Sequence, residues 1–231
     1  DNTGTGKPYC SRFCCMYSLK HAHQIIEKIP GCIPYIFYMD IRSFGKMYEE
    51  FYYRIQDEGA KFIRGRVANI LEDPKTKNLH VYTDDTLLNR PVDVEVDMVV
   101  LAAAIQPKAD TNRTRKLFGV SCSMDGWLLD AHPKLNPCGT TTAGVFLAGV
   151  CQGPKDIPDT VASAEGAASA ASIPIHMGAV ELEPYFAMCI EEKCAGCGMC
   201  VNLCPYQALS LVEKDGRKVM QVTEAKCKGC G

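Results

Sequence analysis

The sequence has no long apolar stretch and no excess of charge of either sign. Its 231 residues carry 25 Lys and Arg against 27 Asp and Glu, a formal net charge of −2, so no basic field attracts nucleic acid. Apolar runs such as residues 98–105 fall well short of the roughly 20 residues that a membrane-spanning helix needs. No secretory signal peptide is visible. We therefore expect a cytoplasmic chain that has no membrane span and does not bind nucleic acid.

Cysteine, in contrast, is abundant, with 14 residues. Nine of them lie in two tight groups, one near each end of the sequence. Many cysteines indicate either the disulfides of a secreted protein or metal ligands in a reducing compartment. The tight grouping and the missing signal peptide favour metal ligands in an anaerobic or at least reducing cytoplasm. Of the five cysteines outside the groups, four lack partners at ligand spacing. We expect Cys32, Cys122, Cys138 and Cys189 to be small buried hydrophobes.

The group near the end has the spacing Cys-x2-Cys-x2-Cys-x3-Cys-Pro, which is typical of bacterial ferredoxins. Gly196 and Gly198 allow the positive φ angles that bring backbone amides close to the cluster sulfides. Zinc is the alternative, because Cys-x2-Cys pairs also build zinc ribbons, but the third and fourth cysteines and Pro205 favour a [4Fe–4S] cluster. Its predicted ligands are Cys194, Cys197, Cys200 and Cys204.

A second copy of this motif follows at a period of 33 residues, since EEKCAGCG at 191–198 recurs as EAKCKGCG at 224–231. Strand-like runs at 208–212 and 218–222, joined by a turn, lie between the copies. The pattern predicts an α+β, two-cluster ferredoxin-like domain over residues 179–231, incomplete in this sequence. In such domains the fourth cysteine of each run binds the other cluster. Cys204 should therefore join Cys227 and Cys230, and we expect the natural protein to continue past Gly231 with x-Cys-x3-Cys-Pro.

The first half of the sequence has the pattern of an α/β unit. We predict a helix at 16–28, a buried strand at 33–39 that ends in Asp40, and a second helix that Ser43 caps and that closes at 57–59. Further strands are expected at 62–70, 80–83, 92–96 and 98–103. This order predicts a Rossmann-like nucleotide-binding unit over residues 1–110.

The turn that should bind a dinucleotide is replaced by cysteines. A Rossmann unit opens with Gly-x-Gly-x-x-Gly and carries an acidic residue about twenty residues later. Asp40 lies at the end of the strand where this acidic residue is expected. However, the position of the glycine-rich turn is occupied by Cys10, Cys14 and Cys15. If this segment is helical, residues 10 and 14 lie one turn apart and residue 15 about 100° further round, so their sulfurs fan across one corner of a cubane. Three packed thiols without a metal are the alternative reading, and nicotinamide binding is not favoured.

Residues 111–178 resemble the C-terminal half of the FAD-binding domain of thioredoxin reductase-like flavoproteins, on the motifs TTTAGVFLAGV, CQGPKDIPDT and VASAEGAASAAS. That resemblance implies a strand that ends at the flavin and a helix whose N-terminus, which is positive, points at the cofactor. Val150 stands where the family has its ribityl-binding Asp, so Asp156 or another group takes that role, and Cys151 lies beside the flavin strand. The implied FAD contacts are Gly149, Gln152, Lys155, Asp156, Ile157 and Thr160.

The order of motifs along the whole chain resembles the A subunit of heterodisulfide reductase and its bacterial relatives. The motifs are CSRFCCMYSLK, FYMDIRSFGKMYEEFY, HPKLNP, GVFLAGVCQGPKDIPDT and the double ferredoxin run. The resemblance implies an incomplete flavoprotein core that binds FAD and its own [4Fe–4S] cluster, held by Cys10, Cys14, Cys15 and a ligand from before Asp1. It also implies that Lys20 lies near flavin N5; a solvated helix lysine is the alternative.

The resemblance further implies an oxidoreductase component of a hetero-oligomeric complex, one that acts in methanogenesis-type metabolism. Its partners are the other heterodisulfide reductase subunits, the small subunit of a hydrogenase or formate dehydrogenase, and ferredoxin. The expected activity is flavin-based electron bifurcation between ferredoxin and a disulfide acceptor such as CoM-S-S-CoB. Two alternatives stay open. One is a non-bifurcating relative in a quinone-interacting or aromatic-reducing complex, and the other is a non-catalytic scaffold that only carries ferredoxin clusters.

Overall fold

The computed structural model describes residues 6–182 and 184–230, and these form two compact units, Asp1–Ile105 and Gln106–Gly231. The predicted division of the second unit after residue 178 remains a prediction. Among the described residues, no helix combines the length and the hydrophobicity that crossing a bilayer requires.

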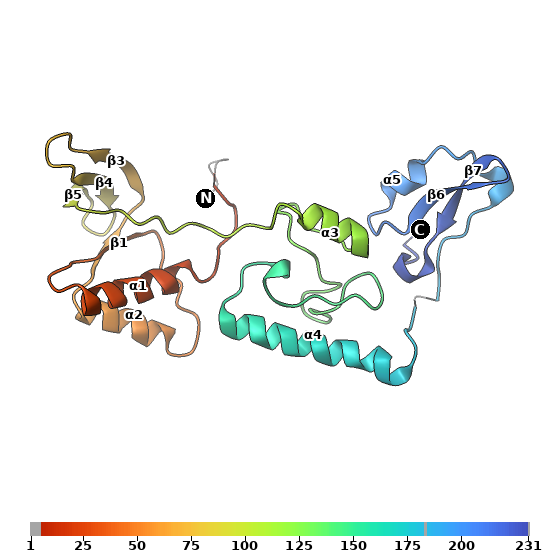
Figure 1. Ribbon diagram of the computed structural model, residues 1–231, viewed down its shortest axis with the longest axis horizontal. Helices are drawn as coiled ribbons and strands as arrows, with labels where there is room; N and C mark the ends of the chain where they lie inside the picture. Colours follow the sequence, from red (N-terminus) through yellow and green to blue (C-terminus); the bar gives the residue numbers. More distant parts are fainter. Residues whose placement is uncertain (1–5, 183, 231) are drawn as a thin grey trace. The chain divides into compact units, whose positions relative to one another are not determined.

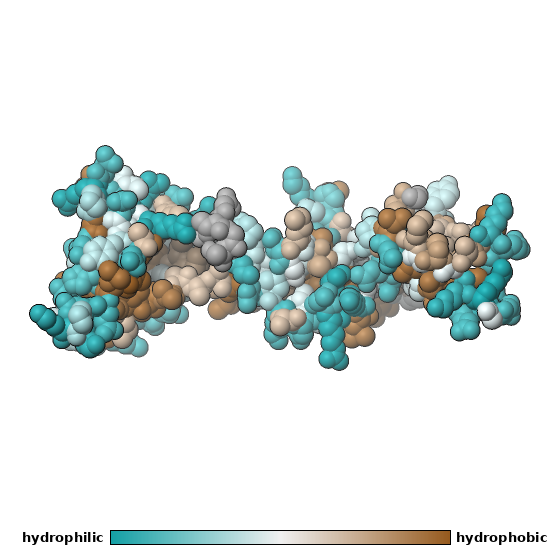
Figure 2. Space-filling view, turned by 90° about the horizontal axis from the view of Figure 1, so that it is seen from above, coloured by the Kyte–Doolittle hydropathy of each residue, from teal (hydrophilic) through white to brown (hydrophobic). Residues whose placement is uncertain are grey.

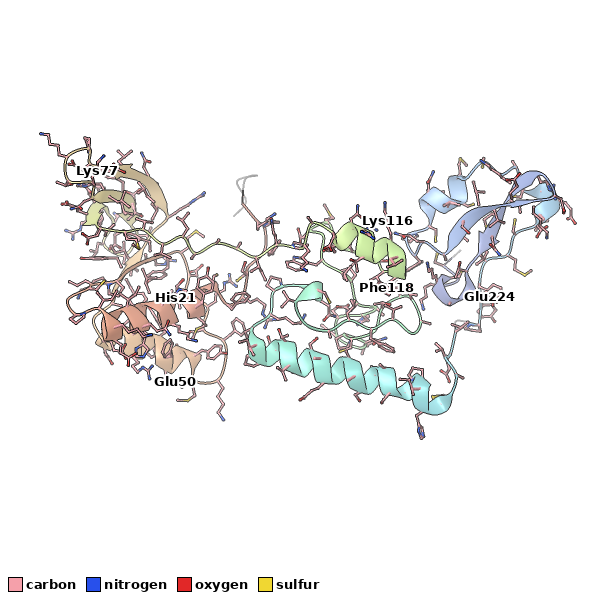
Figure 3. All side chains as sticks on the ribbon, in the orientation of Figure 1. His21, Glu50, Lys77, Lys116, Phe118 and Glu224 are labelled. Carbon is pink, nitrogen blue, oxygen red and sulfur yellow. The ribbon has the colours of Figure 1, made fainter. Side chains whose placement is uncertain are left out.

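The first unit begins with two helices packed on a pair of parallel strands (Figure 1). The elements are α1 (Cys14–Lys28), β1 (Tyr35–Tyr38), α2 (Tyr48–Asp57) and β2 (Lys61–Arg64). Helix α2 is the crossover between the two strands, as parallel pairing requires. The core is built from Leu19 and Ala22 of α1 against Ile55 and Ala60, with Phe62 of β2 packed on it. His21 of α1 and Glu50 of α2 lie on the exposed sides of the two helices (Figure 3).

Helix α1 ends at Lys28 as the sequence predicts but begins at Cys14, two residues before the predicted start, and the run between them contains neither glycine nor proline. It ends at Ile29, whose extended backbone is the conformation that a following proline favours. The predicted cap of α2 was wrong. Ser43 lies outside the helix, and the residue that precedes α2 is Met47, with a left-handed φ of 67°. The Met47 side chain makes no capping hydrogen bond, so the residue types gave no signal for the start of α2 at this position.

An antiparallel sheet of β3 (Val67–Glu72), β4 (Leu79–Asp85) and β5 (Arg90–Val96) follows. The sequence predicted one strand over residues 62–70, whereas the chain forms β2 and β3 separately. Gly65 separates them, and a Cβ on it would collide with the Asp84 carbonyl oxygen. The close approach of β4 at this glycine explains why the chain leaves the parallel pair here and joins the antiparallel sheet.

The strand predicted at residues 98–103 is absent. No strand among the described residues pairs with this segment, and its side chains are largely exposed, with exposed fractions of 75% for Met98, 70% for Val100 and 78% for Leu101. Apolar, β-branched sequence forms a strand only where a neighbouring strand supplies hydrogen bonds. Figure 2 shows apolar areas of this kind in brown between the hydrophilic areas of the surface.

The second unit has α3 (Thr111–Phe118), the short 3₁₀ helix η1 (Gly149–Gln152) and the long α4 (Ile157–Met177). The chain between α3 and η1 is irregular, with isolated bridges such as Gly139–Phe146 in place of the expected flavin-side strand. Val120, Leu128 and Leu147 form its small core. Helix α4 begins at Asp156, whose side chain accepts a hydrogen bond of 2.9 Å from the Asp159 amide, and this satisfies one of the free N-terminal donors.

The last part of this unit has the predicted hairpin. Strands β6 (Leu209–Lys214) and β7 (Arg217–Val222) pair antiparallel, and Asp215 and Gly216 between them have φ angles of 51° and 73°. Two positive φ angles in a two-residue loop match the turn type that fits the twist of a hairpin. The short helices η2 (Glu191–Lys193) and η3 (Glu224–Lys226) directly precede the two cysteine motifs, and α5 (Met199–Leu203) lies within the first motif.

The core of the first unit gives a direct stability test. Leu19 is completely buried, whereas Leu101 is 78% exposed. We expect Leu19→Ala to lower the free energy of unfolding by about 2–5 kcal/mol, because it leaves a cavity between α1 and α2, and Leu101→Ala to change it by less than about 0.5 kcal/mol. Anaerobic urea unfolding followed by circular dichroism measures both, and equal effects would contradict this account of the core.

Candidate iron–sulfur and flavin sites

The cysteines of the first unit lie where α1 begins. Cys14 and Cys15 are its first two residues, but Cys10 precedes the helix in an irregular segment. The expectation that residues 10 and 14 share a helix face was therefore wrong. Arg12 breaks the helical path with a φ of 62°, and its amide donates to Cys10 Sγ at 3.2 Å.

The three sulfurs nevertheless influence one another. The pKa of Cys14 is raised by its hydrogen bond with Cys15, by burial, and by the charges of Cys15 and Cys10. The pKa of Cys15 is lowered to about 6, first by the hydrogen bond with Cys14 and then, against burial, by the backbone and charge of Arg42. Cys15 Sγ lies 3.7 Å from the carbonyl oxygen of Asp40.

Asp40, the acidic residue at the end of the first predicted strand, has a partner on β2. Its carboxylate lies 3.5 Å from the Arg64 guanidinium, so it is paired with β2 in a surface ion pair. Lys20 lies on α1 with its side chain exposed. It belongs to the first unit, whereas the other predicted flavin contacts belong to the second.

The six flavin contacts implied for the second unit lie together in one corner, between η1 and the N-terminus of α4. Lys155 Nζ donates to Gln152 Oε1 at 3.2 Å, and Asp156 caps the helix. Gly149 is buried with a φ of 71°, and a Cβ there would lie 3.1 Å from Thr160. The corner therefore combines a helix N-terminus, which favours anionic groups, with a carboxylate and an amide that suit hydroxyl groups.

In the ferredoxin part, backbone amides are directed at cysteine sulfurs. The Met220 amide donates to Cys194 Sγ and the Ala187 amide to Cys227 Sγ, both at 3.4 Å. These two bonds are related by the 33-residue period of the sequence. The Ala208 amide donates to Cys204 Sγ, also at 3.4 Å. Amide donors stabilise thiolates, and they are among the groups that set the potential of a cluster.

The glycines of the two motifs follow the same symmetry. Gly196 and Gly198 have φ angles of 63° and 78°, which confirms the expected positive torsions, and Gly229, the counterpart of Gly196, has 56°. A Cβ on Gly196 would collide with the Lys218 carbonyl, and one on Gly229 with the Tyr185 carbonyl. Residues 185 and 218 are again 33 apart, so each cysteine loop lies against an extended segment of the other repeat.

Within the described residues, no three His, Cys, Asp or Glu side chains converge closely enough to hold a single metal ion. A cubane distributes its thiolates over four irons, so its ligands need not meet at one point. The donor set of the ferredoxin part, thiols with fixed amide donors, has the chemistry of such a cluster.

Comparison with known proteins places these features in a family. Residues 193–231 match the 4Fe-4S dicluster domain. The chain is 53% identical over 95% of its length to the iron-sulfur A subunit of CoB–CoM heterodisulfide reductase from Methanocaldococcus jannaschii, of which it covers 34%. It is 52% identical over 90% of its length to the A subunit of H(2):CoB-CoM heterodisulfide,ferredoxin reductase from Methanothermobacter thermautotrophicus, of which it covers 32%.

A third relative is the A subunit of H(2)/formate:CoB-CoM heterodisulfide,ferredoxin reductase from Methanococcus maripaludis, which is 50% identical over 93% of the chain and 33% of its own length. The chain belongs to the family of heterodisulfide reductase A subunits. It spans about a third of the length of these curated relatives.

Four cysteines of this family member were expected to be buried hydrophobes, and the structure corrects this. Cys32 is exposed, and Cys122, Cys138 and Cys189 are only partly buried. Cys189 has a close neighbour: burial raises its pKa, and so does its hydrogen bond with Cys194. The spacing Cys-x4-Cys gave no signal for this contact, and the short 3₁₀ helix η2 (Glu191–Lys193) lies between the two cysteines.

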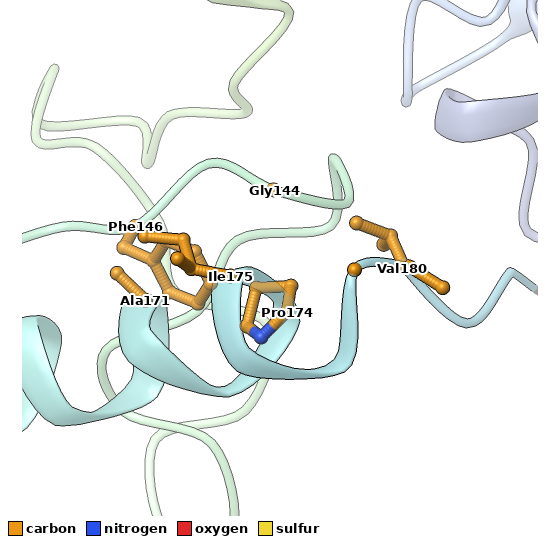
Figure 4. Close-up of a pocket in the computed structure, with 8 residues that line it drawn as sticks. Gly144, Phe146, Ala171, Pro174, Ile175 and Val180 are labelled. Atoms are coloured by element: carbon orange, nitrogen blue, oxygen red, sulfur yellow. The ribbon is translucent and has the colours of Figure 1, made fainter.

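The second unit also has an apolar hollow of about 560 Å³ (Figure 4). Its lining includes Phe146, Pro174 and Ile175, the last two from the far end of α4. At 1.5 Å per helical residue, Pro174 lies about 27 Å along the axis from Asp156. In this member of the family, the hollow is therefore separate from the predicted flavin corner.

The predicted cluster ligands are tested by iron content. We expect Cys200→Ala to lower the iron content of the anaerobically purified protein by about four atoms, because one cubane loses a ligand. Cys138→Ala, at a partly buried cysteine outside the motifs, should leave the iron content unchanged. Iron analysis and visible absorption measure both, and an equal loss in the two variants would contradict the assignment.

Proposed function

We propose that this chain is part of an FAD-containing, iron–sulfur electron-transfer subunit of a heterodisulfide reductase-type complex. The observation that carries the proposal is the identity of 50–53% to subunits of that name over at least nine-tenths of the chain. The match to a dicluster domain at residues 193–231 supports two [4Fe–4S] clusters in the ferredoxin part. A third cluster is proposed at Cys10, Cys14 and Cys15, whose sulfurs interact electrostatically.

The FAD is proposed to bind at the corner between η1 and α4. When bound, it accepts electrons in pairs and releases them one at a time. Asp156 would accept hydrogen bonds from hydroxyl groups of the cofactor, the N-terminus of α4 would favour a phosphate, and buried Gly149 leaves room for close approach. Lys20 would donate a hydrogen bond to flavin N5 and stabilise the reduced anion.

The proposed reaction is electron bifurcation in an anaerobic, hetero-oligomeric complex. When bound, the flavin would in each round take two electrons that come from a hydrogenase or formate dehydrogenase, and would supply one for ferredoxin and one for a disulfide such as CoM-S-S-CoB. Two rounds supply the two electrons that, with two protons, reduce one disulfide to two thiols. The name of the Methanococcus maripaludis relative, which includes hydrogen, formate, the heterodisulfide and ferredoxin, supports these partners.

Two measurements separate this proposal from its alternatives. The first is the flavin content of the anaerobically purified protein, since a scaffold without FAD shows no flavin absorption. The second is potentiometry of the bound flavin, since a bifurcating flavin has its two one-electron potentials in crossed order and a non-bifurcating relative has them in normal order. Co-purification of a hydrogenase or formate dehydrogenase identifies the donor.

Lys20 provides a test of the flavin environment. We expect Lys20→Met to lower the two-electron potential of the bound flavin by about 30 mV, equivalent to about 1.4 kcal/mol, because a positive charge near N5 favours the reduced anion. Lys20→Arg retains the positive charge, so the two-electron potential of its bound flavin should stay close to the wild-type value. Spectroelectrochemical titration measures the shift, and an unchanged potential in Lys20→Met would remove Lys20 from the site.

Asp156 provides a second test. Asparagine retains the capping ability of aspartate, so Asp156→Asn leaves α4 intact but replaces a charged acceptor with a neutral one. We expect flavin to bind about tenfold more weakly, equivalent to about 1.4 kcal/mol, with an unchanged thermal midpoint of the protein without flavin. Flavin fluorescence measures the affinity, and wild-type affinity would exclude the carboxylate from the site.

A further inference from the structure

The side chains on either side of Cys10 bind a segment of the first unit that is distant in sequence. Tyr9 Oη donates to the Ile105 carbonyl oxygen at 2.8 Å, and the Ile105 amide donates to Ser11 Oγ at 3.1 Å. These pairs are separated by 96 and 94 residues. In Figure 1 the red segment before α1 lies across the yellow-green segment that follows β5. Both backbone groups of Ile105 are therefore bonded to the two neighbours of this cysteine.

A third hydrogen bond joins the same distant segment to α1. Tyr17 Oη donates to the Ala103 carbonyl oxygen at 3.1 Å. Tyr17 comes three residues after Cys14, about one helical turn, so the two side chains are neighbours on one face of α1. We call Tyr9, Ser11 and Tyr17 the hydroxyl clamp, since each of them binds residues 103–105 through a side-chain hydroxyl.

Cys10 is the cysteine that most needs such support. The helical backbone fixes the two cysteines of α1, but Cys10 is exposed and precedes the helix in an irregular segment. The Arg12 amide donates to Cys10 Sγ and the Phe13 amide to the Ser11 carbonyl, and these bonds span only two residues each. They shape the turn but do not tie it to the rest of the unit. Ser11, in contrast, is only 4% exposed, so its hydroxyl anchors the segment inside the unit.

The segment that the clamp binds has no strand beside it. In the part of the chain that the structure describes, no strand pairs with residues 98–105, so their backbone groups need partners of another kind. The clamp supplies such partners at residues 103 and 105. It also connects Cys10 to α1 through these residues, by a route that does not follow the chain between Cys10 and the helix.

We propose that the clamp residues Ser11 and Tyr17 are positioning residues, which together with Tyr9 hold Cys10 in place beside the cysteines of α1. This proposal rests on the proposed function, because it takes Cys10, Cys14 and Cys15 as ligands of a cluster. A rigid group binds most tightly to ligands that are already in place, since every residue that is ordered on binding costs conformational entropy. Loss of a clamp hydroxyl should therefore weaken the binding of this cluster, although none of the three hydroxyls is a ligand.

The clamp itself is tested by hydrogen exchange in the anaerobically purified protein. Ser11→Ala removes the acceptor of the Ile105 amide and adds no atom, so this amide should exchange about tenfold faster than in the wild type. Ser172→Ala is the matched control, because Ser172 Oγ donates to the Ser169 carbonyl within α4, and it should leave the exchange at Ile105 unchanged. An Ile105 amide that is unprotected in the wild type, or equal exchange in the two variants, overturns the clamp.

The positioning role is tested by the rate at which a chelator, 2,2′-bipyridyl, removes iron under anaerobic conditions. The iron that Cys14→Ala lacks relative to the wild type identifies the cluster of the first unit. In Tyr17→Phe, which loses only the hydroxyl, this iron should be released about tenfold faster, as it should in Ser11→Ala. Tyr53→Phe is the matched control, since Tyr53 Oη donates to Glu49 on the surface, also at 3.1 Å, and its iron should leave at the wild-type rate.

A second readout separates positioning from a general loss of stability. The electron paramagnetic resonance spectrum of a reduced cluster responds to the arrangement of its ligands and their partners. The spectrum of the first-unit cluster, taken as the difference between each protein and Cys14→Ala, should change in Tyr17→Phe. It should stay as in the wild type in Leu19→Ala, which loosens the core but removes no clamp hydroxyl. Faster iron release in Tyr17→Phe with an unchanged spectrum indicates a structural role alone and overturns the positioning role.

The outcomes distinguish failure of the proposed function from failure of this proposal. If Cys14→Ala retains all the iron of the wild type, the first unit holds no cluster, and the third cluster and the positioning role fail together. If Cys14→Ala loses iron but Ser11→Ala and Tyr17→Phe release it at the wild-type rate, the positioning role alone fails. In either case the exchange of the Ile105 amide decides whether the clamp exists.

Discussion

The hydrogen bonds from Met220 to Cys194 and from Ala187 to Cys227 are the constraint on which the ferredoxin part depends. A thiolate in a folded chain needs donors, and a backbone amide fixed in place supplies one without ordering another side chain. Because the two bonds are related by the 33-residue period, each repeat supplies the donor for the cysteine of the other. Neither cysteine loop therefore has its complete surroundings until both repeats are in place.

The cysteines of the first unit are held in another way. No repeat faces them, and the chain forms the amide contact to Cys10 through a left-handed Arg12. For a residue with a side chain, this conformation costs about 1–2 kcal/mol. The Arg12 guanidinium lies 4.9 Å from the centre of the Phe44 ring, a cation–π contact that offsets part of this cost. Strain of this kind persists where the surroundings impose it, and it is concentrated at functional sites.

Sequence reasoning succeeded where a pattern is local or repeated. The run of α1 without glycine or proline, the turn at Asp215 and Gly216, and the 33-residue period each specify their structure within a few residues. It failed where a partner distant in sequence decides. Gly65 divides a strand because β4 passes close to it, and residues 98–103 have no neighbouring strand among the described residues. The amide donors Met220 and Ala187 were missed as well, although the period that relates them was visible.

The surroundings of the two ferredoxin motifs differ in two ways that act against each other. Reduction adds negative charge to a cluster, and burial disfavours charge. Cys227 is only 9% exposed, whereas its counterpart Cys194 is partly buried and the next pair, Cys197 and Cys230, is exposed in both motifs, so burial at Cys227 would make the proposed second cluster harder to reduce. However, Lys228 stands where the first motif has Ala195, and a positive charge makes the second cluster easier to reduce. Because the two effects oppose each other, the difference that they make together between the potentials of the two proposed clusters is smaller than the difference that either would make alone.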